Sequence, residues 1–223
     1  TETFDSYANG TAITAVGGTG VWTFGGSVVN PGGVNGTAGL GTSGTIFNWK
    51  GQPFTWSSLA TGTKVTMSLD LQTSTTGKFD DDRVGWTITP DASTSTGSQF
   101  ALQLDNNQEG GMVLYHNGTR IPALNALSGI KASTWYRFNV EFTKLTATSA
   151  GIVGTLTELD GSGIPTGTPY VGTITDTSTF ANPPATGLFT AAGQCPSFKN
   201  HSSAPANADN ASFSITLPGP QAP

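Results

Sequence analysis

Three segments of the chain alternate between apolar and polar residues at every second position. Residues 65–72, 100–105 and 136–142 each carry Val, Met, Leu, Tyr or Phe in one phase and mostly polar residues in the other. Because neighbouring side chains of a β-strand point to opposite faces of its sheet, each segment predicts a strand with one buried and one solvent-facing side. No part of the sequence keeps a sustained 3.6-residue apolar period. The pattern therefore predicts an all-β protein.

Further strands are predicted from shorter apolar runs bounded by Gly, Pro, Asn and Asp. These runs are residues 20–24, 45–49, 83–89, 112–116, 151–159, 170–174, 187–190 and 212–217. The 30 Gly and 13 Pro supply the chain reversals that many short strands need. Residues 25–44 and 194–210 are predicted as long loops, and a short helical turn is predicted near 124–127. We therefore predict a two-sheet antiparallel β-sandwich of the jelly-roll kind, one domain over 1–217, followed by a Pro-rich tail or linker start at 218–223.

Composition narrows the class of partner. Only 10% of residues are charged, and the nine Lys and Arg are not clustered in a chain of net charge −5, so the sequence lacks the basic surface that a nucleic acid needs. No apolar run is long enough to cross a bilayer, so membrane insertion is not expected. Cys195 is the single cysteine, which excludes an intrachain disulfide. Because the chain begins at Thr1 rather than Met, we expect a mature protein that is secreted or lies at the cell surface.

Four short segments resemble one known superfamily. The opening residues 2–10, Glu-Thr-Phe-Asp-Ser-Tyr-Ala-Asn-Gly, and the closing residues 209–213, Asp-Asn-Ala-Ser-Phe, are similar to the ends of laminin-G-like domains. Residues 82–86 with 100–105, and residues 134–140, Thr-Trp-Tyr-Arg-Phe-Asn-Val, are similar to their central strands. The chain thus resembles the concanavalin A-like lectin and glucanase superfamily, especially the laminin-G-like domains of secreted bacterial proteins. The resemblance implies a jelly roll whose first and last strands lie side by side.

Carbohydrate binding requires side chains that this sequence places on its predicted strands and loops. Aromatic rings stack on sugar rings, and amides, carboxylates and guanidinium groups bond to sugar hydroxyls. The candidate ligand-binding residues are Trp49, Trp56, Asp70, Gln103, Asp105, Arg137, Asn139 and Glu141. Five of them are predicted to form one polar sheet face: Asp70, Gln103, Arg137, Asn139 and Glu141. The first hypothesis is therefore a carbohydrate-binding or adhesive domain that binds a polysaccharide on this face or on adjoining loops, with core packing as the alternative for each Trp.

Two other functions remain open. The Glu-x-Asp-x-x-Glu strand of a family glucanase is absent. A polysaccharide lyase would instead use Tyr115 or His116 as base and Arg137 to neutralise a uronate carboxylate, although Tyr115 and His116 are neighbours on one predicted strand and cannot both face one cleft. A structural subunit of an extracellular filament, self-associating through strand edges, is the third reading. Enzyme status is left open, with a binding module preferred.

A metal site is predicted near the two ends of the chain. Asp5 and Asp209 are hard oxygen donors, and on the resemblance they are expected to hold a structural calcium ion where the first and last strands meet. The alternative is that both are solvated turn residues. His116, His201 and Cys195 are scattered too far apart in sequence to give a recognisable zinc or copper spacing.

Overall fold

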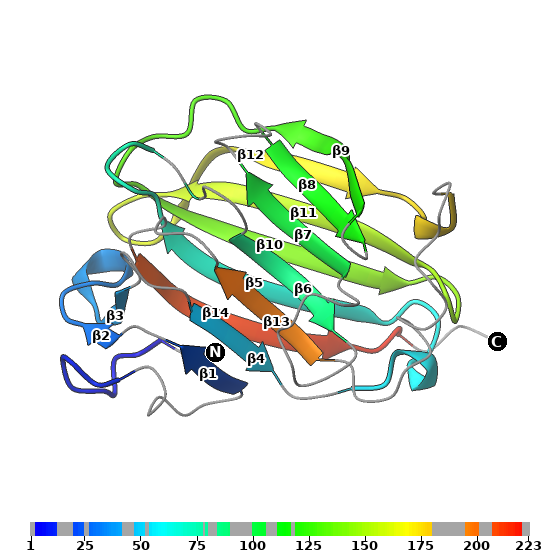
Figure 1. Ribbon diagram of the computed structural model, residues 1–223, viewed down its shortest axis with the longest axis horizontal. Helices are drawn as coiled ribbons and strands as arrows, with labels where there is room; N and C mark the ends of the chain where they lie inside the picture. Colours follow the sequence, from blue (N-terminus) through cyan, green and yellow to red (C-terminus); the bar gives the residue numbers. More distant parts are fainter. Residues whose placement is uncertain are drawn as a thin grey trace.

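Strands make up most of the regular structure in the computed structural model. It describes residues 3–12, 20–24, 27–41, 47–51, 54–77, 79, 84–89, 100–105, 111–116, 119–179, 195–200 and 207–219. These residues form two seven-stranded antiparallel sheets, with one sheet lying in front of the other in Figure 1. The predicted all-β sandwich is confirmed. Across the described ranges, no helix is long and apolar enough to cross a membrane.

Sheet I, the rear layer in Figure 1, has the strand order β12-β11-β10-β5-β14-β3-β2. Its strands are β12 (Pro165–Ile174), β11 (Ala150–Leu159), β10 (Trp135–Lys144), β5 (Lys64–Gln72), β14 (Asn207–Thr216), β3 (Gly39–Gly41) and β2 (Ser27–Val29). Sheet II, the front layer, has the order β1-β4-β13-β6-β7-β8-β9. Its strands are β1 (Gly20–Phe24), β4 (Phe47–Gly51), β13 (Cys195–Asn200), β6 (Val84–Thr89), β7 (Phe100–Asp105), β8 (Gly111–His116) and β9 (Thr119–Ala126). In the described ranges, three short 3₁₀ helices lie between strands: η2 (Val34–Gly36), η3 (Trp56–Ser58) and η4 (Thr177–Thr179).

Several predicted boundaries were wrong. Residues 119–126 form β9 rather than a helical turn. Pro122 is tolerated there because β9 is an edge strand, whose pairing with β8 has a register shift between Met112 and Leu114. The predicted loops 25–44 and 194–210 contain β2, β3, β13 and the start of β14. These Gly- and Asn-rich sequences show no strand pattern, and their strands are stabilised by pairing with neighbouring strands. The strand predicted at 187–190 lies outside the described residues.

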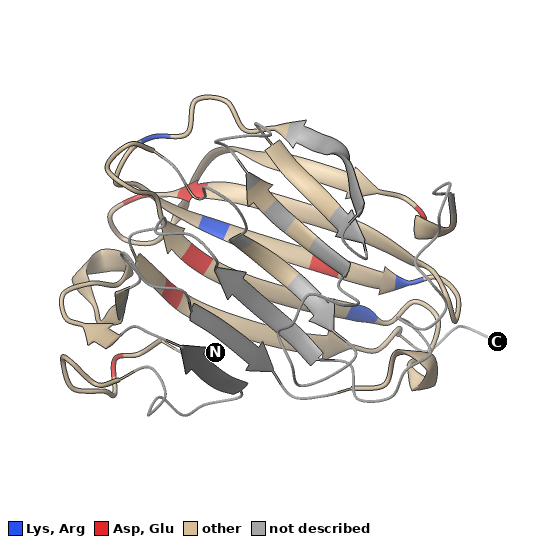
Figure 2. Ribbon diagram, viewed as in Figure 1, with Lys and Arg blue, Asp and Glu red and all other residues tan. Residues whose placement is uncertain are grey.

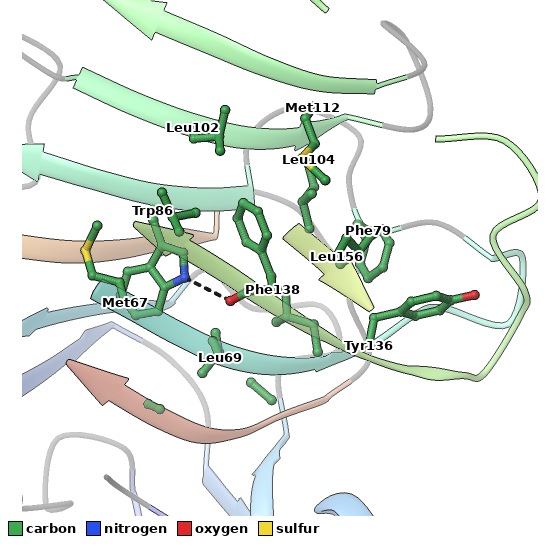
Figure 3. Close-up of a cluster of buried hydrophobic side chains, with 14 of the residues drawn as sticks. Met67, Leu69, Phe79, Trp86, Leu102, Leu104, Met112, Tyr136, Phe138 and Leu156 are labelled. Atoms are coloured by element: carbon green, nitrogen blue, oxygen red, sulfur yellow. Dashed lines mark hydrogen bonds between the residues drawn. The ribbon is translucent and has the colours of Figure 1, made fainter. Parts of the chain in front are cut away.

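The core lies between the two sheets (Figure 3). On β5 and β10 every second residue is buried, as the alternation predicts. The inward apolar side chains of both strands are at most 1% exposed: Val65, Met67, Leu69, Leu71, Tyr136, Phe138, Val140 and Phe142. Opposite them, sheet II contributes Trp86, whose indole Nε1 donates to the Phe138 carbonyl oxygen at 3.4 Å. A side chain at Gly154 would collide with Leu102, so glycine lets the sheets approach here.

The first and last strands do not pair in the described part of the chain. Strand β14 pairs with β3 and β5, and residues 3–12 contribute one isolated bridge, from Ala12 to Ser27. The expectation of side-by-side terminal strands was therefore wrong for these residues. The N-terminal segment instead reaches the β2–β3 loop, where Asp5 accepts a hydrogen bond from the Ala38 amide at 3.1 Å.

Candidate functional site

The outer face of sheet I carries the polar phase of β10. Arg137, Asn139 and Glu141 are half-buried there, while their neighbours on the strand point into the core. Asp70 of β5 is in register with Arg137 and shares this face. Gln103 and Asp105 lie on β7 of sheet II, so the single five-residue face does not form. Alternation identifies the residues that share a face of one strand, but it does not identify the sheet to which that strand belongs.

Asp70 is held by three donors and is fully buried. Arg137 donates from Nε to Asp70 Oδ1 at 2.7 Å and from Nη2 to Oδ2 at 2.8 Å, and Asn210 Nδ2 donates to Oδ2 at 2.9 Å. Asn210, with φ 53°, lies in a bulge of β14 that breaks the register between Asp209 and Ser212. The hydrogen bond to Asp70 raises the pKa of Arg137. Asp70 therefore has no exposed surface for a ligand, which corrects its assignment as a direct contact.

Charged residues are sparse over the described surface (Figure 2). On the outer face of sheet I, Glu141 forms an ion pair with Lys64, with 2.9 Å between Nζ and Oε1. Asn139 is half-buried between Arg137 and Glu141 on the same strand. The binding roles of Arg137, Asn139 and Glu141 stay predictions.

A small pocket lies at one end of sheet I, where β5 ends and β10 and β14 begin. Gln72 is in register with Trp135 on one side and with Asn207 on the other, so the three residues form a row across neighbouring strands. Opposite the row, the β2–β3 loop contributes Pro31, Gly32, Gly33 and Gly36. The pocket has a volume of about 200 Å³. We call these seven residues the end pocket.

The row offers a flat ring beside an amide pair. Asn207 Nδ2 donates to Gln72 Oε1 at 2.8 Å. This bond leaves the Gln72 amide nitrogen as a donor and the Asn207 amide oxygen as an acceptor, with no partner for either among the described residues. Trp135, Gln72 and Asn207 are all half-buried, so each is fixed by packing yet reachable from solvent. The pocket can therefore bond a ligand that both donates and accepts, next to an indole face.

Asp5, near the start of the chain, and Asp209, near its end, fix the β2–β3 loop, which forms the other wall of the end pocket. Asp209 Oδ2 accepts from the Val34 amide at 3.0 Å and from Thr37 Oγ1 at 3.4 Å. A Cβ atom at Gly33 would lie 2.6 Å from that oxygen and would collide with the Ala38 carbonyl oxygen, so only glycine fits here. The wall of the pocket is thus built in place rather than formed by a ligand.

Asp209 is buried among other charges. It is 1% exposed, and burial raises its pKa to about 7 from an ordinary value of 3.8. The nearby negative charges of Asp70 and Asp5 add to this rise, while the amides of Asn210 and Val34 oppose it. The folded protein therefore favours the neutral form of Asp209 more strongly than the unfolded chain does.

This raised pKa predicts a fall in stability with rising pH. A group that binds its proton more tightly when folded contributes most below its unfolded pKa, and the contribution is lost as pH rises from about 4 through about 7. In chelator-treated protein, we expect the unfolding free energy to fall by about 2 kcal/mol between pH 5 and pH 8. Urea denaturation measures it, with Asp209→Asn as the control that should flatten the pH profile. An unchanged profile in that variant would show that another group is responsible.

The proposed metal ligands meet at one loop. Asp5 and Asp209 both accept from backbone amides of residues 34–38. Asp5, Asp70 and Asp209 bring three carboxyl groups to one region, where Arg137 bonds to Asp70. The described residues contain no group of three His, Cys, Asp or Glu placed to hold a metal ion. Asp5 and Asp209 would therefore need further oxygen donors from carbonyl groups or water.

The other predicted site residues are not brought together. Trp56 is fully buried in the core, so it has no face for a sugar. Lys144 Nζ fixes this segment by donating to the carbonyl oxygens of Trp56, Ser57 and Leu59 at 2.8, 3.1 and 2.5 Å. The side chains of Trp49, Gln103, Asp105, Tyr115 and His116 lie outside the described part of the structure.

The lyase constellation is divided between the two sheets. Tyr115 and His116 end β8 of sheet II, whereas Arg137 lies on the outer face of sheet I, with the core between the layers. The backbones of these residues therefore lie in different layers.

Comparison with known proteins identifies the fold. No family model matches the sequence, and no curated protein matches it. Lectin I-B4 of Griffonia simplicifolia, in its metal-free form, matches the structure with a TM-score of 0.56 at 11% identity, covering 92% of this chain and 96% of that one. Lectin UEA-II in complex with galactose matches with a TM-score of 0.57 at 10% identity, covering 96% and 100%. Lectin II of Ulex europaeus gives 0.54 at 9% identity, covering 89% and 93%. The chain therefore has the concanavalin A-like jelly-roll fold of the legume lectins.

Proposed function

We propose that this chain is a carbohydrate-binding domain of a secreted or cell-surface protein and that the end pocket receives a sugar residue of a polysaccharide. One observation carries the proposal: Trp135 lies in a row with the Gln72–Asn207 amide pair at the mouth of a preformed pocket. An indole face and a few convergent polar groups are the features by which sugar sites hold their ligands. The lectin fold supports the same class of ligand.

The volume of the end pocket suits one sugar ring rather than a long stretch of polysaccharide. Pockets for drug-sized ligands occupy about 300–1,000 Å³, and this pocket has about 200 Å³. A site of this size holds one sugar ring while the rest of a chain lies outside. Because Asp5 and Asp209 already fix the β2–β3 loop, little ordering of the wall opposes binding.

Replacing Trp135 with alanine is expected to weaken glycan binding about tenfold or more. The change removes the stacking surface, and a Trp at the centre of a binding site contributes about 2 kcal/mol or more. A glycan array would identify the ligand, and calorimetry would compare affinities. Thr66→Ala is the matched control, since Thr66 is half-buried on the polar phase of β5 and away from the end pocket. Equal affinity in wild type and Trp135→Ala would contradict the proposal.

The lyase alternative lacks a supporting arrangement in the described residues. A base and a carboxylate-neutralising group must face the same uronate, and two nitrogens of Arg137 already bond to Asp70. Release of unsaturated uronate from alginate or pectin, followed by its absorbance, is the measurement that decides enzyme status.

Three of the four sheet edges among the described residues discourage strand-edge assembly into a filament; β1, the fourth, has five residues and no proline. Edge strand β12 contains Pro165 and Pro169, edge strand β9 contains Pro122, and edge strand β2 has three residues. Prolines and short edges are the features that discourage pairing between copies.

We also propose that Asp5 and Asp209 hold a structural calcium ion. The support is that both carboxyl groups meet at residues 34–38, where a cation would relieve the repulsion from Asp70 and Asp5 that helps to raise the pKa of Asp209. Calcium at a hundredfold excess over its Kd stabilises a protein by about 2.7 kcal/mol, which corresponds to a rise in Tm of about 5–10 °C for a chain of this length. Calorimetry with calcium, with magnesium and with chelator measures the shift. Asp5→Asn should abolish it, and equal Tm values in calcium and chelator would contradict the site.

A further inference from the structure

We infer that the end pocket selects an uncharged pyranose with two neighbouring free hydroxyls and rejects uronates and other anionic sugars. The inference rests on the proposed glycan binding and names the ligand class of the same pocket. It follows from three features of the described residues: the pocket lining, the charges around it and the spacing of the row.

Among the described residues, the lining contains no ionisable side chain. It consists of one Pro, three Gly, Gln72, Trp135 and Asn207. A sugar carboxylate brought into the pocket would lose water and meet no cation in return. Burial of an unpaired charge is costly, whereas a hydroxyl finds its bonds in the amide pair. The lining therefore favours a neutral ligand.

The charged residues described next to the pocket offer no free cation to an anionic sugar. Asp209 is two residues from Asn207, and it anchors the wall loop together with Asp5. Arg137, two residues from Trp135, is the nearby cation, but two of its nitrogens bond to the carboxylate of Asp70. In the calcium-free protein, the described residues around the pocket therefore offer a bound anion no unpaired cation, in a chain of net charge −5.

The row matches a single sugar ring. Residues directly opposite on antiparallel strands have Cβ atoms about 4.5–5.5 Å apart, so the row from Trp135 through Gln72 to Asn207 spans about 10 Å. A pyranose stacked on Trp135 would direct the hydroxyls at its far edge to the amide pair. The Gln72 nitrogen donates to one hydroxyl and the Asn207 oxygen accepts from its neighbour. Two neighbouring hydroxyls supply this combination.

The test uses matched probes. Methyl glycosides of glucose, galactose and mannose are compared with their uronates, which keep the ring and change only carbon 6. Calorimetry or ligand-observed NMR gives the affinities at low and high salt, with chelator present so that no calcium lies beside the pocket. We expect at least one neutral glycoside to bind tenfold or more tightly than its uronate. We also expect salt to leave the neutral affinity unchanged, because screening acts on charged pairs.

A positive charge placed in the pocket should shift its preference from neutral sugars toward uronates. Asn207→Lys is expected to raise the ratio of uronate to neutral affinity tenfold or more. Thr216→Lys is the control, because it adds the same charge to exposed surface at the opposite end of β14. A wild-type protein that binds the uronate as tightly as the neutral sugar overturns the inference but leaves glycan binding intact. A protein that binds no glycoside here and no glycan on an array overturns the proposed function as well.

Discussion

Replacing Trp56 with alanine is expected to lower the unfolding free energy by about 3–5 kcal/mol. The side chain is fully buried in the cluster that joins the two sheets, and three carbonyl oxygens of its segment are fixed by Lys144. Removing the indole would leave a cavity that such a fixed segment cannot close. Urea denaturation at a constant pH measures the change.

The matched comparison is Trp135→Ala, which removes the same side chain from the half-buried rim of the end pocket. Its expected loss of stability is smaller, about 1 kcal/mol, since a half-buried side chain gives up fewer packing contacts than one in the core. The two variants therefore separate a tryptophan of the core from a tryptophan of the binding site. A Trp56→Ala protein that kept wild-type stability and lost glycan binding would reverse that assignment.

Arg137→Ala is expected to cost about 2–3 kcal/mol of unfolding free energy. Breaking a buried ion pair by removing one partner costs about 3–5 kcal/mol, because the remaining charge stays buried. Asp70 is fully buried, but the side chain of Arg137 is 36% exposed. Water can therefore partly replace the guanidinium group, and the expected loss lies at or below the low end of that range. Asn210 still donates to Asp70 in the variant.

Lys131→Ala provides the control for this prediction. Lys131 forms an ion pair with Glu158 at 2.6 Å, close to the 2.7 Å of the Arg137 pair, but the lysine side chain is 62% exposed. Solvent-exposed pairs contribute little, so no measurable loss is expected. Similar losses in both variants would show that separation, rather than burial of Asp70, determines the strength of these pairs.

The sequence predicts the fold class and the central strands because alternation depends on local chemistry. The phase of β5 and β10 correctly separates core residues such as Met67 and Phe138 from outer residues such as Arg137. Pairing is different, because it depends on contacts between segments far apart in the chain. Gln103 alternates as convincingly as Asp70, yet the two lie in different sheets. Strands in Gly-rich segments, such as β3, also escape prediction.

The end pocket was missed for the same reason. One local signal exists, since Trp135 shares the phase of Arg137, Asn139 and Glu141 and is therefore an aromatic residue on a polar face. Gln72 shares the phase of Asp70. Asn207, however, joins the row only through the pairing of β14 with β5, which no sequence spacing reveals. The sequence instead indicates Trp56 as a binding residue, because a tryptophan beside a predicted turn looks the same in sequence whether it is buried or exposed.

The most direct test of glycan binding at the end pocket is an NMR titration of isotope-labelled protein with a glycan identified on the array. The Trp135 indole N–H and the side-chain amides of Gln72 and Asn207 are expected to shift together and to saturate at one Kd. The indole signals of Trp56 and Trp86, both buried in the core, should move little. Shifts confined to sheet II, with the three signals of the end pocket unchanged at saturation, would contradict the account.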